Sequence, residues 1–210
     1  GSSQSGRFLR QFLYEGFNES EGGSRVFDGL QINVAGAGRG SFNHRFAQPS
    51  RHASAHFDVY YPTEEFPFAD TSQQDGRDGR RDGLFNRALE RGVLPKVFHV
   101  NSSTEYWNRG AALTHVDVAG ERDLLIHDAA RIYHFASTQH GADELPQGRE
   151  DLPGNPVEFK LGHRALLLAL SAWVQEGREP PPSCYPTLAD GTLVDPQEAS
   201  FAFPPLSALG

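Results

Sequence analysis

Only one cysteine, Cys184, occurs among the 210 residues of this sequence. A single thiol cannot close a disulfide within the chain, and no Cys-x-x-Cys pair is present to bind zinc or to exchange disulfides. The sequence therefore excludes an internally disulfide-linked scaffold and a cysteine-based zinc or redox site, while leaving the redox compartment open. We expect no cofactor and no metal site.

Long apolar runs and an excess of positive charge are missing too. No apolar run approaches the roughly 20 residues that span a bilayer. The chain has 19 Lys and Arg against 27 Asp and Glu, a formal net charge of −8, whereas a nucleic-acid groove needs clustered cations to displace phosphate counterions. The sequence therefore predicts neither a transmembrane segment nor a nucleic-acid partner.

The composition is that of an ordinary globular chain. Hydrophobic residues make up 38% of the sequence and aromatic residues 11%, which is enough to bury one sizeable core at this length. We predict a single domain over residues 1–210.

The first residues combine a serine that has small neighbours with a periodic apolar stretch. Ser3 lies between Gly1 and Ser5, as the nucleophile of a G-x-S-x-G elbow lies between two small residues where a strand turns sharply into a helix. Ser5 departs from the usual glycine, and Gly6 follows one place later. The apolar residues recur at helical spacing: Phe8, Leu9, Phe12, Leu13 and Phe17. The segment predicts a turn that leads into a helix.

Two interpretations of Ser3 are open at this stage. Ser3 is either an elbow nucleophile, with the backbone N–H of Gln4 as one oxyanion donor, or a plain helix N-cap, a role that Ser5 could also fill. A glycine-serine opening is also typical of a cloning remnant. An elbow needs a strand before it, so the first interpretation places the earlier strands and the second oxyanion donor upstream of Gly1. Under it, the chain is the C-terminal portion of a domain whose N-terminal half is its missing partner.

Two polar groups follow predicted strands further along the chain. Runs of apolar residues predict strands at 26–35, 96–100 and 131–136, a strand pair at 113–118 and 124–126, and helices at 84–91 and 161–174. Glu105 comes shortly after the strand at 96–100, and His140 comes shortly after the strand at 131–136. Because the carboxyl ends of parallel strands meet at one edge of a sheet, we expect Ser3, Glu105 and His140 to converge there.

Other residues compete for the same roles. Asp117, Asp123 and Asp128 are alternative acids, and Glu105 could instead be a first-turn helix carboxylate behind a Ser103 or Thr104 cap. His99 and His134 are alternative bases, but both lie inside predicted strands, where a histidine is more often a hydrogen-bonded core residue. We therefore favour His140 as the base and Glu105 as the acid.

Prolines and aromatic residues interrupt the periodic pattern from residue 41 to about 83, and we predict a lid-like insertion at 41–95. Two roles are open for its aromatic residues: lining a pocket for an acyl or aromatic acid group, or forming the core of a lid. His52, His56 and Asp58 have a spacing that suits metal ligands on a helix, but no zincin glutamate accompanies them, so we interpret them as surface residues.

Several motifs together resemble a bacterial family of α/β-hydrolase-domain proteins, over nearly the whole chain. They are SQSGRFLR at 3–10, AGAGRG at 35–40, EYW at 105–107, TQHG at 138–141 and the proline-rich stretch before Tyr185. The resemblance implies a serine hydrolase fold, an ester-cleaving activity and, in many members, export from the cytoplasm; for this chain the compartment is unknown.

We therefore predict an α/β fold, the C-terminal portion of an α/β-hydrolase, with a mostly parallel sheet flanked by helices. The predicted function is cleavage of a small-molecule carboxylic ester through an acyl-enzyme on Ser3. An amidase or peptidase with the same triad is one alternative, because the pocket rather than the nucleophile selects the leaving group. A non-catalytic hydrolase-like module that binds a partner is the other.

Overall fold

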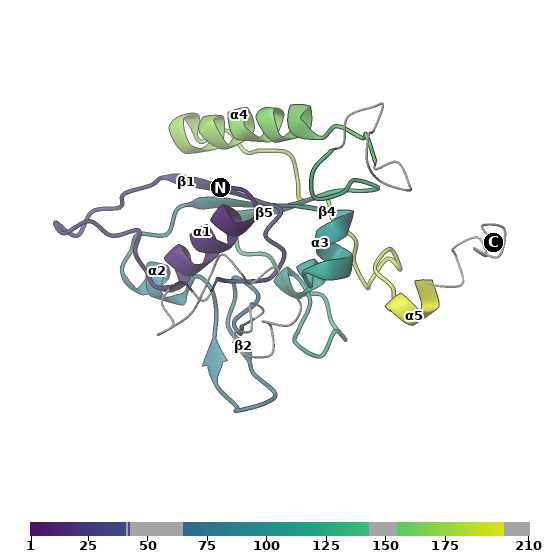
Figure 1. Cartoon of the computed structure of the whole chain (residues 1–210). Helices are drawn as coiled ribbons and strands as arrows, with labels where there is room; N and C mark the ends of the chain where they lie inside the picture. Colours follow the sequence, from purple (N-terminus) through teal and green to yellow (C-terminus); the bar gives the residue numbers. More distant parts are fainter. Residues whose placement is uncertain (41, 43–64, 143–154, 200–210) are drawn as a thin grey trace.

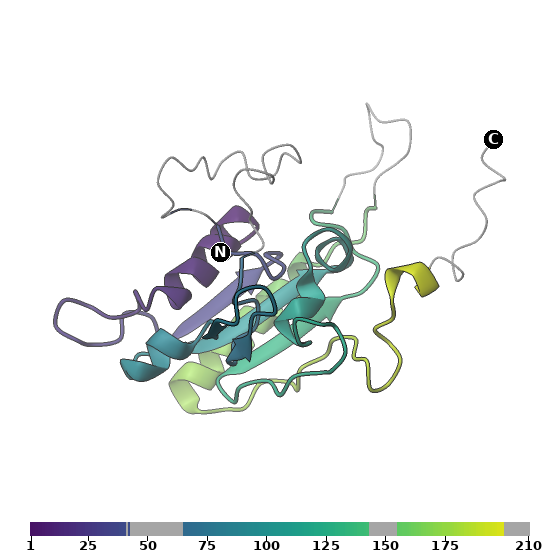
Figure 2. The same cartoon turned by 90° about the horizontal axis from the view of Figure 1, so that it is seen from below.

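The computed structural model describes residues 1–40, 42, 65–142 and 155–199. A three-stranded parallel sheet in the order β1-β4-β5 lies at its centre, with α4 on one face and α1, α2 and α3 on the other (Figures 1 and 2). The elements are α1 Gln4–Tyr14, β1 Gly29–Asn33, β2 Gln73–Gln74, β3 Arg81–Asp82, α2 Asn86–Glu90, β4 Lys96–Ser102, α3 Ser103–Asn108, the 3-10 helix η2 Ala111–Thr114, β5 Ala130–Phe135, α4 Lys160–Glu176 and α5 Pro196–Ala199. The predicted α/β class with a parallel sheet and flanking helices is confirmed.

The register of the sheet brings three strand ends to one edge. Ile32 of β1 pairs with His99 of β4, and His99 pairs in turn with Ile132 of β5. All three strands run in the same direction, so the segments that follow them leave from the same edge of the sheet. This edge is where the sequence places Glu105 and His140.

Apolar side chains fill both faces of the sheet. On one face, Leu30, Ile32 and Val97 pack with Leu13 of α1 and with Phe85. On the other face the cluster joins β4 and β5 to α4, and its buried members are Phe98, Val100, Tyr133, Leu166, Leu170 and Trp173. Each fully buried large apolar side chain contributes about 1.5–3 kcal/mol relative to an exposed one. Successive side chains of a strand point alternately into the two clusters, so apolar residues are needed on both faces of the sheet, as expected for a parallel sheet that is covered on both sides.

The predicted strand pair at 113–118 and 124–126 is wrong. The first of these segments begins in η2, and its one strand-like pairing within the described residues is an isolated bridge from Val116 to Asp123, the residue before the second segment. The carboxylate of Asp117 accepts hydrogen bonds from the backbone N–H groups of Glu121 and Arg122 at 2.8 and 3.3 Å. These bonds stabilise a turn where the ladder of a strand pair would have continued.

The described part of the predicted insertion, residues 65–95, packs onto the body of the domain. Leu84 and Phe85 are fully buried in the core cluster on the α1 side, and α2 packs against α1. Asp70 is buried beneath α1, close to His99 of β4. His52, His56 and Asp58 lie outside the described residues. The lid role of the insertion stays a prediction.

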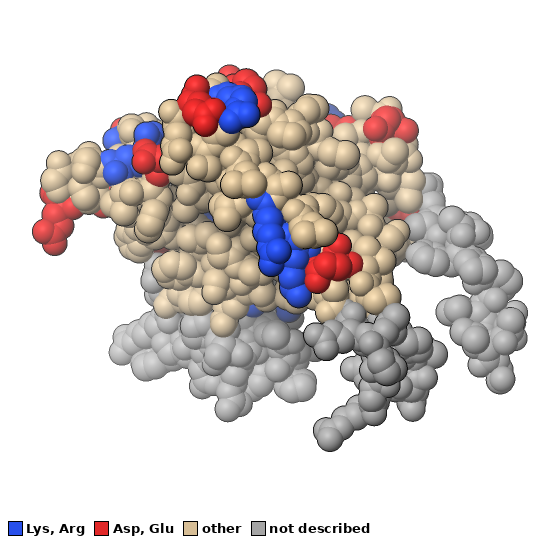
Figure 3. Space-filling model, turned by 90° about the horizontal axis from the view of Figure 1, so that it is seen from above, with Lys and Arg blue, Asp and Glu red and all other residues tan. Residues whose placement is uncertain are grey.

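The side of the molecule that α4 covers is mostly tan in the view from above, with a few blue and red patches (Figure 3). Leu161 is 70% exposed and Leu168 is 73% exposed on this helix. No helix in the described part of the chain is both long enough and apolar enough to cross a membrane. Within the described residues, therefore, α4 leaves apolar surface uncovered.

Candidate active site

Ser3 occupies a sharp turn between a strand-like segment and α1. Ser2 forms a parallel bridge with Asn33 at the end of β1, and the backbone N–H of Ser3 donates to the carbonyl of Asn33 at 2.9 Å. The backbone of Ser3 has φ 56° and ψ −122°, a combination that costs a non-glycine residue on the order of 1–3 kcal/mol. Ser3 stands at the N-cap of α1, yet its side chain makes no capping bond. Its hydroxyl is instead turned toward His140.

The glycines around this turn have steric reasons to be there. A Cβ on Gly1 would lie 2.6 Å from the carbonyl oxygen of Ser5, and a Cβ on Gly6 would lie 2.8 Å from that of Asn33. The side chain of Ser5 is exposed. The close approach of α1 to the end of β1 therefore falls at Gly6, which accounts for a serine at position 5 where the elbow pattern has glycine.

Glu105 is fully buried at the start of α3, directly after β4. Its Oε2 accepts hydrogen bonds from the backbone N–H and the hydroxyl of Ser102, at 2.9 and 2.5 Å, which forms a capping box at the first turn of the helix. Its Oε1 lies 2.6 Å from Nδ1 of His140. Glu105 is thus both a helix-capping carboxylate and the partner of His140. From the sequence, these two roles were alternatives.

The imidazole of His140 connects Glu105 with Ser3. Glu105 is an acceptor, so Nδ1 of His140 donates and its Nε2 is left to accept; Nε2 lies 2.9 Å from Oγ of Ser3. Burial by itself raises the pKa of a carboxyl, but the hydrogen bonds from His140 and Ser102 outweigh it and lower the pKa of Glu105 below its ordinary value of 4.5. Glu105 is therefore ionised at neutral pH, and its contribution to stability is lost only as the pH falls through that lowered pKa.

The residues before Glu105 hold the loop that carries His140. The backbone N–H of His140 donates to Oγ1 of Thr104 at 3.1 Å, and that of Ser137 donates to Oγ of Ser103 at 2.9 Å. The backbone N–H of Ser103 in turn donates to the carbonyl of Thr138 at 3.1 Å. From the sequence, Ser103 and Thr104 were predicted only as possible helix caps. Their contacts with the loop depend on a pairing across more than 30 residues, which no local pattern reveals.

Replacing Thr104 by valine should lower kcat by about 5- to 10-fold, because it removes the acceptor for the His140 backbone N–H while keeping the side-chain volume. Steady-state hydrolysis of an ester, the reaction proposed below for this site, measures the change. Thr114→Val is a matched control, because the Thr114 hydroxyl donates to Ala111 within η2. Equal kcat in Thr104→Val and wild type would contradict this role for Thr104.

The competing residues have other partners. Asp117 pairs with Arg122 at 3.0 Å, and Asp123 accepts the backbone N–H groups of Leu188 and Ala189. His99 contacts Asp70, and Nε2 of His134 lies 3.3 Å from Oγ of Ser103. The hydrogen bonds of the described residues therefore join Ser3, His140 and Glu105, and bring none of the alternative acids to His140.

Gln4, the expected oxyanion donor, is the first residue of α1, so its backbone N–H lies at the positive end of the helix dipole.

Aromatic and histidine rings pack behind α3. The hydroxyl of Tyr106 lies 2.9 Å from Nε2 of His115, and the Tyr106 ring is 4.5 Å from that of His134. The ring of His115 lies 4.5 Å from that of Tyr185. Because Tyr106 directly follows Glu105, these contacts fix α3 and therefore the position of Glu105.

Acid pH is expected to destabilise the protein through His115. Burial lowers the pKa of His115 to about 4 from the ordinary 6.5, with Asp123 acting in the opposite direction. Because the folded pKa is the lower one, the stability contributed by neutral His115 is complete above pH 6.5 and is lost as the pH falls from 6.5 toward 4, by about 2 kcal/mol at pH 5. Urea unfolding at pH 7.5 and pH 5 measures this loss. An equally large loss in His115→Gln would contradict the assignment.

The described residues contain no group of three or more His, Cys, Asp or Glu side chains that could hold a metal ion. The fold, with helices on both faces of a parallel sheet and a serine elbow at its edge, is that of the α/β-hydrolase class. A family model described as alpha/beta hydrolase domain matches residues 1–200, and the chain belongs to this family of hydrolases. No curated protein and no solved structure matches the chain.

Proposed function

We propose that this hydrolase cleaves small carboxylic esters through an acyl-enzyme formed on Ser3. The observation that supports the proposal is the unbroken series of contacts from Oγ of Ser3 to Nε2 of His140 at 2.9 Å and from Nδ1 of His140 to Oε1 of Glu105 at 2.6 Å. Nucleophile, base and acid within hydrogen-bond distance of one another are the arrangement that activates a serine hydroxyl.

Each group has one task in the reaction. His140 takes the hydroxyl proton of Ser3 as Oγ attacks the ester carbonyl, and then returns it to the leaving alcohol when the acyl C–O bond breaks. In the second half His140 removes a proton from water, whose oxygen attacks the acyl-enzyme, and the acid product leaves as Ser3 regains its proton. Glu105 stabilises the imidazolium in both halves. The backbone N–H of Gln4 donates to the oxyanion, and one such donor contributes on the order of 100-fold or more to kcat.

The same three groups could serve amide cleavage, because the fit of the leaving group in the pocket decides between ester and amide substrates. A non-catalytic binding role is the second candidate, and the observation that favours it is the exposed apolar surface of α4 around Leu161 and Leu168. A binding module with no catalytic role would need neither the strained φ of Ser3 nor a buried, ionised Glu105.

Hydrolysis of p-nitrophenyl acetate and butyrate tests the proposal. We expect turnover with a rapid first release of p-nitrophenol, equal in amount to the enzyme, if breakdown of the acyl-enzyme is the slower half. The matching anilides compare amide cleavage with ester cleavage in the same site. Absence of both ester and anilide hydrolysis by the folded protein would move the assignment to the binding role.

A further inference from the structure

A second polar cluster lies under α1, separate from the contacts of Ser3 and His140. Arg10, in the second turn of α1, is fully buried. Its guanidinium donates to the carbonyl oxygens of Gly38 at 3.1 Å and Ala37 at 3.0 Å, in the segment that follows β1. It also donates to the carbonyl of Phe68, in the segment that leads to α2. One side chain thus ties the helix that carries Ser3 to two distant segments.

His99 of β4 connects Arg10 to a buried carboxylate. Nδ1 of His99 lies 3.4 Å from Nη1 of Arg10, and its Nε2 lies 3.0 and 3.1 Å from the two carboxylate oxygens of Asp70. Arginine has no acceptor, so Nδ1 accepts from Arg10 while Nε2–H donates to Asp70. His99 is therefore held as one tautomer between a cation and an anion, at the centre of the sheet.

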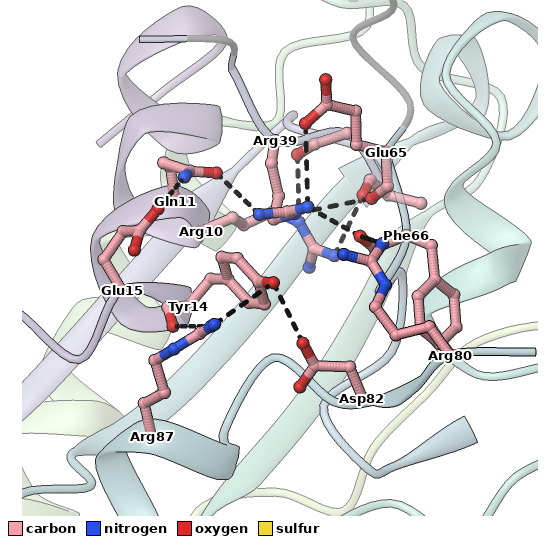
Figure 4. A network of polar contacts seen from close by, with 12 residues as sticks. Arg10, Gln11, Tyr14, Glu15, Arg39, Glu65, Phe66, Arg80, Asp82 and Arg87 are labelled. Atoms are coloured by element: carbon pink, nitrogen blue, oxygen red, sulfur yellow. Dashed lines mark hydrogen bonds and ion pairs between the residues drawn. The ribbon is translucent and has the colours of Figure 1, made fainter. Parts of the chain in front are cut away.

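Arg39 makes the reciprocal connection from the segment after β1. Its guanidinium donates to Oε1 of Gln11 at 2.9 Å and to the carbonyl of Phe66 at 2.7 Å, and it lies 3.8 Å from the centre of the Tyr14 ring. Gln11 and Tyr14 belong to α1, and Figure 4 shows these side chains meeting between the helix and the neighbouring segments. The segment at 36–40 is therefore bonded to α1 in both directions, through Arg10 and through Arg39. The segment at 65–70 is bonded to α1 by Arg10 and to the segment at 36–40 by Arg39.

Such a cluster is costly for stability alone. Burial lowers the pKa of Arg10 to about 10, while Asp70 raises it in part. Buried ion pairs contribute little net stability compared with a well-packed apolar core, but a fully hydrogen-bonded network specifies one arrangement of the groups that it joins. The group most dependent on such an arrangement is Ser3, because it begins α1 and must meet His140 from another loop.

We propose that Arg10, His99 and Asp70 form a positioning unit that fixes α1, and with it Oγ of Ser3, relative to His140. The unit acts through α1 and touches no reacting atom. This inference rests on the proposed function, since it assigns the purpose of the cluster to the reaction of Ser3. Placement errors of about 1 Å in a catalytic group cost on the order of 100-fold in rate.

Arg10→Lys, Asp70→Asn and His99→Gln test the unit kinetically. We expect Arg10→Lys to lower kcat by on the order of 10- to 100-fold, with KM and the shape of the pH profile unchanged. His99→Gln retains one donor and one acceptor, so it should keep more activity than His99→Leu; this pair decides the matter if Arg10→Lys does not fold. The control is Asn18→Ala, since Asn18 is fully buried and bonds the backbone of Phe27 and Val93. It should lower stability and leave kcat unchanged.

Hydrogen exchange tests the unit without any activity. In Arg10→Lys, amide exchange should rise by at least about 10-fold in α1, 36–40 and 65–70 together, while α4 stays as in wild type. Unchanged exchange in these segments, or a kcat loss in Asn18→Ala as large as in Arg10→Lys, would overturn the proposal. If wild type hydrolyses no ester, the proposed function fails, and the exchange result still decides whether the unit fixes α1.

Discussion

Replacing Ser3 by alanine is expected to lower kcat for ester hydrolysis by on the order of 10⁴-fold or more. The substitution removes Oγ, the only atom that forms the acyl-enzyme. The start of α1 should stay in place, because the Ser3 side chain makes no capping bond to the helix. Stopped-flow release of p-nitrophenol measures both the initial burst and the steady state. The burst should vanish with the turnover.

Ser5→Ala is the matched control for this experiment. Ser5 lies two residues away in the same turn, and its side chain is exposed. We expect kcat in Ser5→Ala within about 2-fold of wild type, as for other exposed substitutions away from the reacting groups. An active Ser3→Ala, or an inactive Ser5→Ala, would contradict the assignment of the nucleophile.

The second large effect is expected from the charge on Glu105. Glu105→Gln should lower kcat by on the order of 10²- to 10⁴-fold, because an amide NH₂ facing Nδ1 of His140 favours the tautomer that carries its proton on Nε2. That nitrogen then cannot accept the proton of Ser3. His140→Ala should lower kcat as much as Ser3→Ala. The double variant His140→Ala/Glu105→Gln should lose little more, as expected for three residues that act as one catalytic unit.

The capping role of Glu105 makes stability a necessary second measurement. Glutamine can still accept the hydrogen bonds from Ser102 that close the first turn of α3, so Glu105→Gln should unfold at nearly the wild-type urea concentration. Ser102→Ala serves as the control, since it removes one capping bond and leaves the Glu105 carboxylate beside His140. Glu105→Gln with wild-type kcat would exclude Glu105 as the acid. Equal kcat losses in Ser102→Ala and Glu105→Gln would trace the effect to the position of α3.

Much of the fold follows from local patterns in the sequence. Short runs of apolar residues predict β4 and β5, and the strongly apolar run at 161–174 predicts α4, which spans Lys160–Glu176. The pair at 113–118 and 124–126 misleads because short apolar stretches in both segments suit strands, whereas hydrogen bonds to the Asp117 carboxylate close the chain into a turn. Local pattern carries no information on that competing carboxylate.

The candidate site was partly visible in the sequence. Chain order and strand ends bring Ser3, Glu105 and His140 to one edge, because parallel strands share a direction. The sequence did not predict the long-range contacts around the site. Thr104 bonds the His140 backbone across 36 positions, and Arg10 contacts His99 across 89. Such pairs depend on how α1 and α3 dock on the sheet, which only the packing of the whole domain determines.

Covalent labelling of the wild-type protein by a fluorophosphonate, mapped by peptide mass spectrometry, tests the central claim most directly. Fluorophosphonates react with an activated serine and not with an ordinary hydroxyl. The account predicts one adduct per chain, on Ser3, lost in Ser3→Ala, kept in Ser5→Ala and much slower in His140→Ala. No adduct on the folded wild-type protein, or an adduct on another residue, would contradict it.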